Sequence, residues 1–301
     1  MNTSYDYLVC DVFTEKLYSG NQLAVLPNAE GLTDAQMQQI AREFNYSETA
    51  FVFNTNHNFY KKLKIFTPLN EVPFAGHPNI GTAFALTSLG QFGEIKNPKR
   101  VTFEQKAGLV EIEISIDNNG KIFCELKAPE KFSLGTEIPV DLIASAISIL
   151  PSQIITDTHL PCVASVGLPF VFVELRNSDI LKKAKINIEG FEQIMLTGIQ
   201  PSLYLYVKGN EKFNILSRMF APLSGVYEDP ATGSAGCAVS ALLAYHHHSN
   251  SEIFTYTIGQ GFEIRRKSVL KSRVVKEDSS IKSAWIGGNA IISCRGKITV
   301  N

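Results

Sequence analysis

Three side chains that could handle a proton lie within a sequence that the chain contains twice. Residues 66–83 read FTPLNEVPFAGHPNIGTA and include His77, whereas residues 220–235 read FAPLSGVYEDPATGSA and include Asp229 and Ser234. Aligned from their right-hand ends, the two segments place His77 opposite Asp229. The repeat predicts two half-molecules, each of which supplies a titratable group to one site.

Both copies lead from a turn rich in glycine and proline into a run of small and apolar residues. The runs, residues 81–89 and 233–245, are apolar on nearly every side, so each predicts a buried helix. The N-terminus of such a helix presents free N–H groups and the positive end of the helix dipole. Two helix starts that face one another would therefore hold a small carboxylate.

A fourth candidate, Glu48, lies at the start of a predicted strand, residues 47–53. One further strand, residues 63–66, separates it from His77, so neighbouring strands could bring both side chains to one end of a sheet. Desolvation can raise the pKa of an enclosed carboxyl group, which lets it give and take a proton near neutral pH. The chemistry expected is proton transfer at carbon, with the helix N-termini offsetting developing charge. A solvated carboxylate at the start of a strand is the alternative that the residues leave open.

Length and composition favour a small-molecule partner. A chain of 301 residues can form two domains, and its 28 basic and 29 acidic residues create no global field for nucleic acid or an anionic membrane. No run of about 18 apolar residues could span a bilayer, and the N-terminus lacks the pattern of a secretion signal. These features predict a cytoplasmic protein. The five cysteines form no CxxC pair and are predicted to be buried free thiols.

No cofactor motif accompanies the candidate residues. The glycine motifs that bind dinucleotides and phosphates, the HExxH zinc motif and the GxSxG elbow are all absent. The consecutive histidines 246–248 point in different directions, so a solvated helix end is favoured over a metal site. Residues 265–267 are predicted to form a surface strand, with approach to an anionic ligand as the alternative. We expect neither a cofactor nor a metal.

The elements that must position the candidate residues are mostly strands. Thr33 and Gln36 form a capping box for a helix that Asn45 ends. Further helices are expected at residues 141–150 and 187–195. Turns are expected at residues 118–120, 259–261 and 287–289. Strands are expected at residues 5–13, 23–26, 47–53, 63–66, 101–104, 110–116, 122–127, 162–166, 170–175 and 202–207, and over most of 254–300. Two closed or nearly closed sheets, each around a central helix, account for this order.

The longer motifs resemble a known family. DVFT (11–14), GN (20–21), MQQIAREFNYSETAFVF (37–53), the His77 segment and EDPATGSAGCA (228–238) are similar to the phenazine-biosynthesis PhzF isomerase family, which belongs to the diaminopimelate-epimerase-like superfamily. The resemblance runs from about residue 5 to 300. It implies an α+β fold of two pseudo-symmetric domains, each a strongly curved, mostly antiparallel, barrel-like sheet around a central helix. It also implies an active site in the cleft between the domains, cofactor-free catalysis and a homodimer.

The implied domains are residues 1–130 with a C-terminal strand at about 286–301, and residues 131–285. In the phenazine enzyme the glutamate of SETAF moves a proton between carbons of trans-2,3-dihydro-3-hydroxyanthranilate, and this role maps onto Glu48. The residues that lie around the substrate map onto His77, Asp229 and Ser234. The backbone amides that hold the substrate carboxylate map onto Gly76, His77, Gly233 and Ser234.

Three departures limit what the resemblance implies. Diaminopimelate epimerase uses one cysteine from each domain as an acid/base pair, whereas the corresponding turns here carry Ala75 and, approximately, Thr232. Racemisation by two cysteines is therefore not expected. Gln22 stands where the family more usually has proline, and residues 264–268 replace a common GRPS-like turn, so substrate preference is not carried over from that loop.

We therefore predict a cofactor-independent isomerase or epimerase that moves a proton between carbons of a small carboxylated metabolite. Glu48 is the expected general acid/base. Two other hypotheses stay open at this point: a related lyase or hydro-lyase, and a non-catalytic protein that uses the same fold to bind a ligand or a partner.

Overall fold

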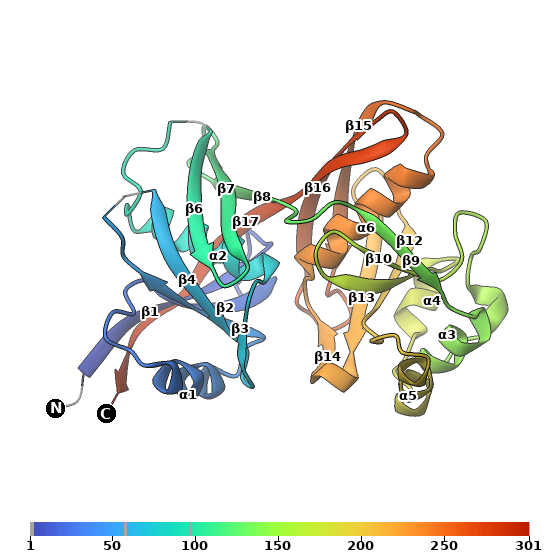
Figure 1. Ribbon diagram of the computed structural model, residues 1–301, viewed down its shortest axis with the longest axis horizontal. Helices are drawn as coiled ribbons and strands as arrows, with labels where there is room; N and C mark the ends of the chain where they lie inside the picture. Colours follow the sequence, from blue (N-terminus) through green and yellow to red (C-terminus); the bar gives the residue numbers. More distant parts are fainter. Residues whose placement is uncertain (1–2, 57–58, 97, 301) are drawn as a thin grey trace. The chain divides into compact units, whose positions relative to one another are not determined.

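The computed structural model describes residues 3–56, 59–96 and 98–300 (Figure 1). The chain divides into two compact units, residues 1–127 with 287–301 and residues 128–286. Each unit combines a strongly curved sheet with a buried helix, so the fold is α+β, as predicted.

The sheet of the first unit closes on itself around one helix. Hydrogen bonding runs β1–β2–β3–β4–β6–β7–β8–β17 and returns to β1, with the β2–β3 and β4–β6 pairs parallel and the hairpin pairs antiparallel. The elements are β1 (Thr3–Val12), β2 (Asn21–Leu26), α1 (Asp34–Phe44), β3 (Glu48–Phe53), β4 (Tyr60–Phe66), β5 (Glu71–Val72), α2 (Gly76–Ser88), β6 (Lys99–Gln105), β7 (Gly108–Ile116), β8 (Ile122–Lys127) and the second part of β17 (Ser280–Val300). Helix α2 packs against five of these strands, which is why it can be apolar all round.

The second unit repeats this order of strands and helices around α6. Its strands pair in the order β9–β10–β11–β12–β13–β15–β16, and again two pairs, β11–β12 and β13–β15, are parallel. The elements are β9 (Ser133–Glu137), α3 (Val140–Ala146), β10 (Cys162–Ser165), β11 (Pro169–Glu174), α4 (Ser178–Lys183), α5 (Ile188–Leu196), β12 (Leu203–Lys208), β13 (Ile215–Ala221), β14 (Val226–Asp229), α6 (Gly233–His246), β15 (Glu252–Gln260), β16 (Ser268–Glu277) and the first part of β17.

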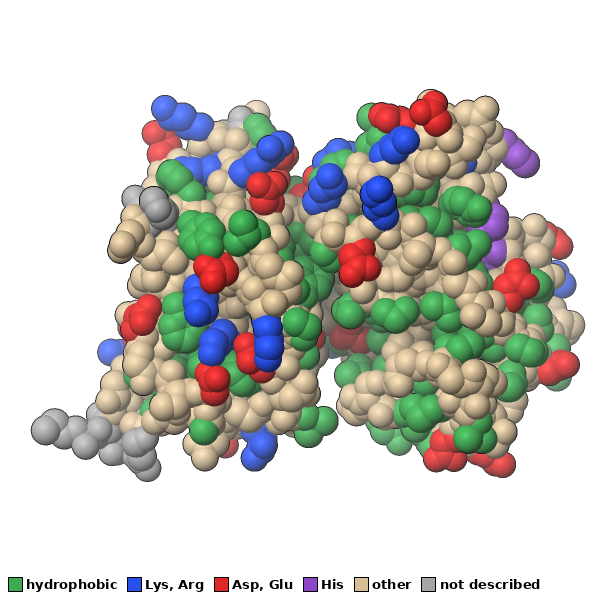
Figure 2. All heavy atoms as spheres, viewed as in Figure 1, with side chains coloured by type: hydrophobic (Ala, Val, Ile, Leu, Met, Phe, Trp, Pro, Cys, Tyr) green, Lys and Arg blue, Asp and Glu red, His purple; other side chains and the backbone are tan. Residues whose placement is uncertain are grey.

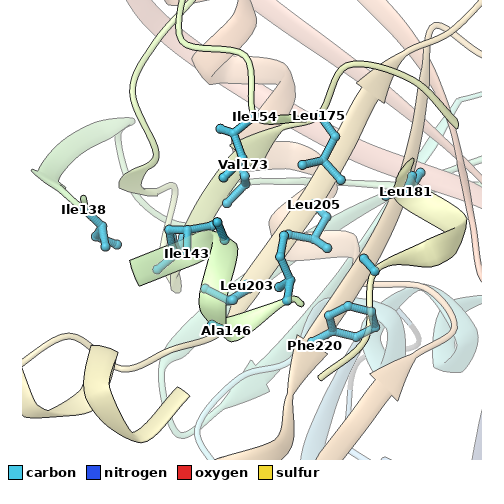
Figure 3. Packing of buried hydrophobic residues seen from close by; sticks show 14 of the residues in the cluster. Ile138, Ile143, Ala146, Ile154, Val173, Leu175, Leu181, Leu203, Leu205 and Phe220 are labelled. Carbon is cyan, nitrogen blue, oxygen red and sulfur yellow. The ribbon is translucent and has the colours of Figure 1, made fainter. Parts of the chain in front are cut away.

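Each unit also has at least one helix on the outer face of its sheet. In the second unit Ile143 of α3 packs with Leu205 of β12 and Phe220 of β13 in a cluster that α4 and α5 complete (Figure 3). In the first unit Met37 and Ile40 of α1 take the corresponding place over β2, β3 and β4. Alternate residues of one strand therefore serve two cores, one outside and one around the central helix.

The capping of α1 follows the prediction. The Gln36 backbone N–H donates to the Thr33 hydroxyl at 3.3 Å, and the Thr33 N–H donates to the Gln36 side chain at 3.0 Å. Asn45 ends the helix with a left-handed backbone, φ 52°.

Several local predictions were wrong. Residues 287–289 do not turn, because β17 runs through them, and a Cβ at Gly287 would lie 2.7 Å from the Cys124 carbonyl oxygen. These glycines permit close approach to β8 rather than a reversal of the chain. Residues 265–267 belong to a turn and a coil instead of a strand. The helix expected over 141–150 ends at Ala146, and α4 was not anticipated.

Close packing of α2 against the sheet allows no side chain at Gly81. A Cβ there would lie 2.6 Å from Leu23 Cδ2 and 2.7 Å from Val12 Cγ2. We expect Gly81→Ala to destabilise the protein by about 1–3 kcal/mol in urea denaturation, because the added methyl overpacks the core. Gly236→Ala in α6 is the matched control, since its nearest neighbour would be 3.3 Å away. Equal stability of the two variants would contradict this account of the packing.

The surface shows no strong bias towards acidic or basic side chains. Acidic and basic side chains are interspersed over the visible face of both units (Figure 2). Four cysteines are buried and free, whereas Cys294 is free but exposed, unlike the prediction. Over the described residues, no helix has the length and hydropathy needed to cross a membrane.

Candidate active site

The start of β3 and the start of α2 meet inside the first unit. Glu48 is the first residue of β3 and His77 the second residue of α2. Glu48 Oε2 lies 3.5 Å from His77 Nδ1, and the two side chains are 19% and 6% exposed, respectively. The carboxylate is thus accessible at one edge while the imidazole behind it is buried.

The imidazole of His77 is neutral. Burial lowers the pKa of this ring from 6.5 to about 3, and a hydrogen bond with the Gln22 backbone opposes the shift only in part. The contact with Glu48 is therefore between a carboxylate and a neutral ring instead of an ion pair. An acceptor beside Nδ1 favours the tautomer that carries its proton on Nδ1. Nε2 is buried and has no hydrogen-bond partner among the described residues, so the ring carries an unsatisfied acceptor on the side away from Nδ1.

The pKa of His77 predicts how stability depends on pH. A folded-state pKa below the unfolded value means that the full stability is present above pH 6.5 and is lost as the pH falls towards about 3. We expect the His77 ring to remain neutral in ¹⁵N NMR spectra between pH 5 and 8, and His77→Gln to remove up to about 1.4 kcal/mol per pH unit from the acid slope of stability. An imidazolium signal at pH 6 would contradict this assignment.

The first turn of α2 leaves backbone donors uncovered. Ala75 precedes the helix in an extended conformation, and no side chain caps the turn. Gly76 and His77 therefore direct their N–H groups at the space before the helix, and Pro78, the third residue, has no N–H to satisfy. Asn79 holds this helix start in place by donating to the Ala75 carbonyl at 2.8 Å. A small anion is the ligand that such a turn binds best.

The second unit builds a related arrangement at the start of α6. Half-buried Asp229 ends β14, and the Thr232 hydroxyl donates to Asp229 Oδ2 at 2.6 Å. Gly233 and half-buried Ser234 are the first two residues of α6, whose first turn also has no side-chain cap. This helix start therefore combines a carboxylate with uncovered N–H groups.

The structure corrects the register of the sequence repeat. Helix α2 begins at Gly76, five residues before the expected start, whereas α6 begins at Gly233 as predicted. His77 therefore corresponds to Ser234 as the second residue of its helix. Ile65 pairs with Val72 in the first unit and Met219 with Asp229 in the second, so Val72 occupies the place that corresponds to Asp229. The sequence alignment went wrong because the proline and glycine after His77 read as a turn although they are helical.

Sequence reasoning missed two glutamines that form hydrogen bonds at the starts of the central helices. Gln105 ends β6 and bonds to Asn79 of α2, and Gln260 ends β15 and bonds to Thr232 at the start of α6. Both are buried, Gln260 completely. Each ends the strand that follows the central helix, and a glycine lies within the next three residues. That shared position was the signal in the sequence.

The other polar groups considered in the sequence analysis are histidines 246–248 and residues 265–267. His246 ends α6, histidines 247 and 248 follow it, and all three are exposed. The described residues include no cluster of three or more His, Cys, Asp or Glu side chains that could hold a metal ion. Arg265 is exposed, with a left-handed backbone at φ 59°.

Comparison with known proteins places this chain among isomerases. It is 32% identical to an uncharacterized isomerase of Mesorhizobium japonicum, with 98% of this chain and 99% of the relative covered. It is 30% identical to the trans-2,3-dihydro-3-hydroxyanthranilate isomerase of Pseudomonas fluorescens, with 98% and 100% covered. The fold is also that of a PhzF-family phenazine biosynthesis protein of Bacillus anthracis, with a TM-score of 0.90, 24% identity and coverage of 99% and 100%.

The family model agrees with these relatives over nearly the whole chain. Residues 10–296 match the model described as phenazine biosynthesis-like protein, PhzC-PhzF. Both candidate helix starts and Glu48 lie inside the matched range. The chain belongs to the PhzC-PhzF family of phenazine biosynthesis-like proteins.

Proposed function

We propose that this protein is a cofactor-independent isomerase that moves a proton between carbons of a small metabolite bearing a carboxylate. The observation that carries the proposal is the pair of Glu48 and His77, with a half-buried carboxylate 3.5 Å from a buried neutral imidazole at an uncapped helix start. The isomerase relatives and the family membership support the reaction class.

Glu48 serves as the general acid/base in this proposal. Its carboxylate removes a proton from a substrate carbon and returns the proton to another carbon. Neutral His77 does not hold Glu48 in a permanent ion pair, so the carboxylate stays available for both steps. We assign His77 to holding Glu48 in position, through the contact between its Nδ1 and Glu48 Oε2.

The start of α2 holds the substrate carboxylate. The N–H groups of Gly76 and His77 stabilise the anion and offset the negative charge that develops when the carbon is deprotonated. We assign Asp229 and Ser234 to positioning the substrate in the same reaction, together with the Gly233 amide.

Solvent exchange tests this proposal directly. The protein is incubated in D₂O with trans-2,3-dihydro-3-hydroxyanthranilate and with a panel of small amino and hydroxy acids, and each is followed by proton NMR. Deuterium at a carbon position, with product of unchanged elemental composition, is the expected result. Loss of water or of another group from the substrate would instead identify a lyase. Absence of exchange with every compound would contradict carbon acid/base catalysis on this class of substrate.

A further inference from the structure

We propose that Gln260 and Thr232 are positioning residues that orient and charge-stabilise the carboxylate of Asp229. The kinetic part of this inference rests on the proposed function, whereas the hydrogen-bond relay itself does not. The relay runs from the end of β15 through the residue that precedes α6 to the end of β14.

The orientation of the Gln260 side chain is fixed by its partners. Its Oε1 accepts from the Thr232 backbone N–H at 3.1 Å, and its Nε2 donates to the Asp229 carbonyl at 2.8 Å and to the Thr232 hydroxyl at 3.0 Å. A flipped amide would place its NH₂ group against the Thr232 N–H and its oxygen against the Asp229 carbonyl, so only one orientation fits. With no solvent exposure, the amide has no alternative partner in water.

This orientation determines where the Thr232 hydroxyl sends its proton. The hydroxyl oxygen accepts from Gln260 Nε2, and its single proton is then directed to Asp229 Oδ2, 2.6 Å away. A short hydrogen bond donated to a carboxylate stabilises the ionised form and fixes its rotation. The relay thus delivers one defined donor to one defined carboxylate oxygen.

The local structure forgoes a helix cap to make this bond. A threonine that precedes a helix ordinarily caps the first turn with its hydroxyl, as Thr33 does for α1. Thr232 makes no such cap bond, because its hydroxyl turns to Asp229. The hydroxyl therefore stabilises the Asp229 carboxylate, and the first-turn N–H groups of α6 stay uncovered.

The first unit shows what the same scaffold does without a carboxylate. Gln105 occupies the position that corresponds to Gln260, yet it bonds to Asn79, which donates to the Ala75 carbonyl. Val72 stands in the place of Asp229. There the glutamine only braces the helix start, so the link through Thr232 to a carboxylate is specific to the second unit.

Surrounding contacts keep the relay rigid. Gly261 follows Gln260 with φ 76°, and a Cβ at this glycine would lie 2.6 Å from the Pro230 carbonyl oxygen. Ser268 donates to the same carbonyl at 2.8 Å. The backbone between Asp229 and Thr232 is therefore held from β15 and β16, and only the side-chain relay is free to be altered by substitution.

The test measures the ionisation of Asp229 without relying on turnover. The protein is labelled with ¹³C at aspartate Cγ, the Asp229 signal is assigned by its loss in Asp229→Asn, and the signal is titrated. We expect Thr232→Val to raise the midpoint by about one pH unit, and Thr232→Ser to restore it. Gln260→Glu should raise it as well, because the new carboxylate draws the Thr232 hydroxyl away from Asp229. Ser240→Ala, which removes a buried hydroxyl that donates to the Gly236 carbonyl in α6, should leave the midpoint unchanged.

Kinetics with trans-2,3-dihydro-3-hydroxyanthranilate complete the test. We expect Thr232→Val to lower kcat about tenfold and to shift the acid limb of the pH profile upward, with rescue by Thr232→Ser. An unchanged midpoint in both Thr232→Val and Gln260→Glu would overturn the relay whether or not the enzyme turns over. If Thr232→Val fails to fold, Gln260→Glu alone decides. If the variants shift the Asp229 midpoint but the wild-type protein exchanges no substrate, the relay is upheld and the proposed function is contradicted.

Discussion

Glu48→Gln is expected to lower deuterium incorporation by about 10²- to 10⁴-fold while the protein remains folded. The amide has nearly the same shape as the carboxylate but cannot accept and return a proton. Since His77 is neutral, the substitution breaks no ion pair and leaves no stranded charge. Exchange measured by proton NMR in D₂O, together with a thermal unfolding midpoint close to that of the wild type, checks both halves of the expectation.

Two further variants make this result specific to position and geometry. Glu113→Gln alters another strand glutamate of the first unit, which faces Arg100 at 3.5 Å on the surface, and should exchange at the wild-type rate. Glu48→Asp keeps the acid but withdraws it by one methylene, and a displacement of about 1 Å can cost about 10²-fold in rate. Full exchange in Glu48→Gln would move the general base to another residue.

Arg218→Met is expected to have the largest effect on stability, a loss of about 3–5 kcal/mol. Arg218 is 8% exposed, and its Nε and Nη2 donate to the two oxygens of Glu228 at 2.9 and 2.8 Å. Its Nη1 donates to the carbonyls of Leu181 and Ala184, each at 2.9 Å, at the end of α4. Removing the guanidinium leaves the Glu228 carboxylate, which is 11% exposed, without this partner and leaves those carbonyls without this donor.

Urea denaturation separates the stranded charge from the lost contacts. The double variant Arg218→Met/Glu228→Gln should recover part of the loss, because the second change removes the unpaired carboxylate. Arg100→Met is the matched control, since its ion pair with Glu113 is 74% and 38% exposed and should contribute less than about 1 kcal/mol. Wild-type stability in Arg218→Met would show that the buried pair adds nothing.

The parts of the fold that could be predicted are those that neighbouring residues determine. Thr33 and Gln36 satisfy each other within one turn, and Asn45 ends α1 because it tolerates a left-handed backbone. The apolar runs of α2 and α6 predict burial because no exposed helix lacks a polar face. Belonging to a known family follows from long ordered motifs, which the comparison with relatives confirmed.

The parts that could not be predicted depend on contacts distant in sequence. Whether His77 lies before or inside a helix is decided by the sheet that surrounds α2, and local glycine and proline signals favoured a turn. Gly287 likewise read as a turn, although its role is to let β17 pass close to Cys124. The partners of Gln260 could not be predicted from its neighbours in the sequence, because Asp229 and Thr232 lie about 30 residues earlier.

The strand β17 also determines when the first unit can be completed during synthesis. The ring around α2 needs residues 287–300 between β1 and β8, yet the whole second unit, residues 128–286, is translated first. At about 5–20 residues per second, that delay lasts roughly 10–30 s. For this time β1 and β8 of a nascent chain have open edges that can pair with other chains. The order of translation therefore exposes this protein to aggregation during synthesis, although the completed ring leaves β1 and β8 with no open edge.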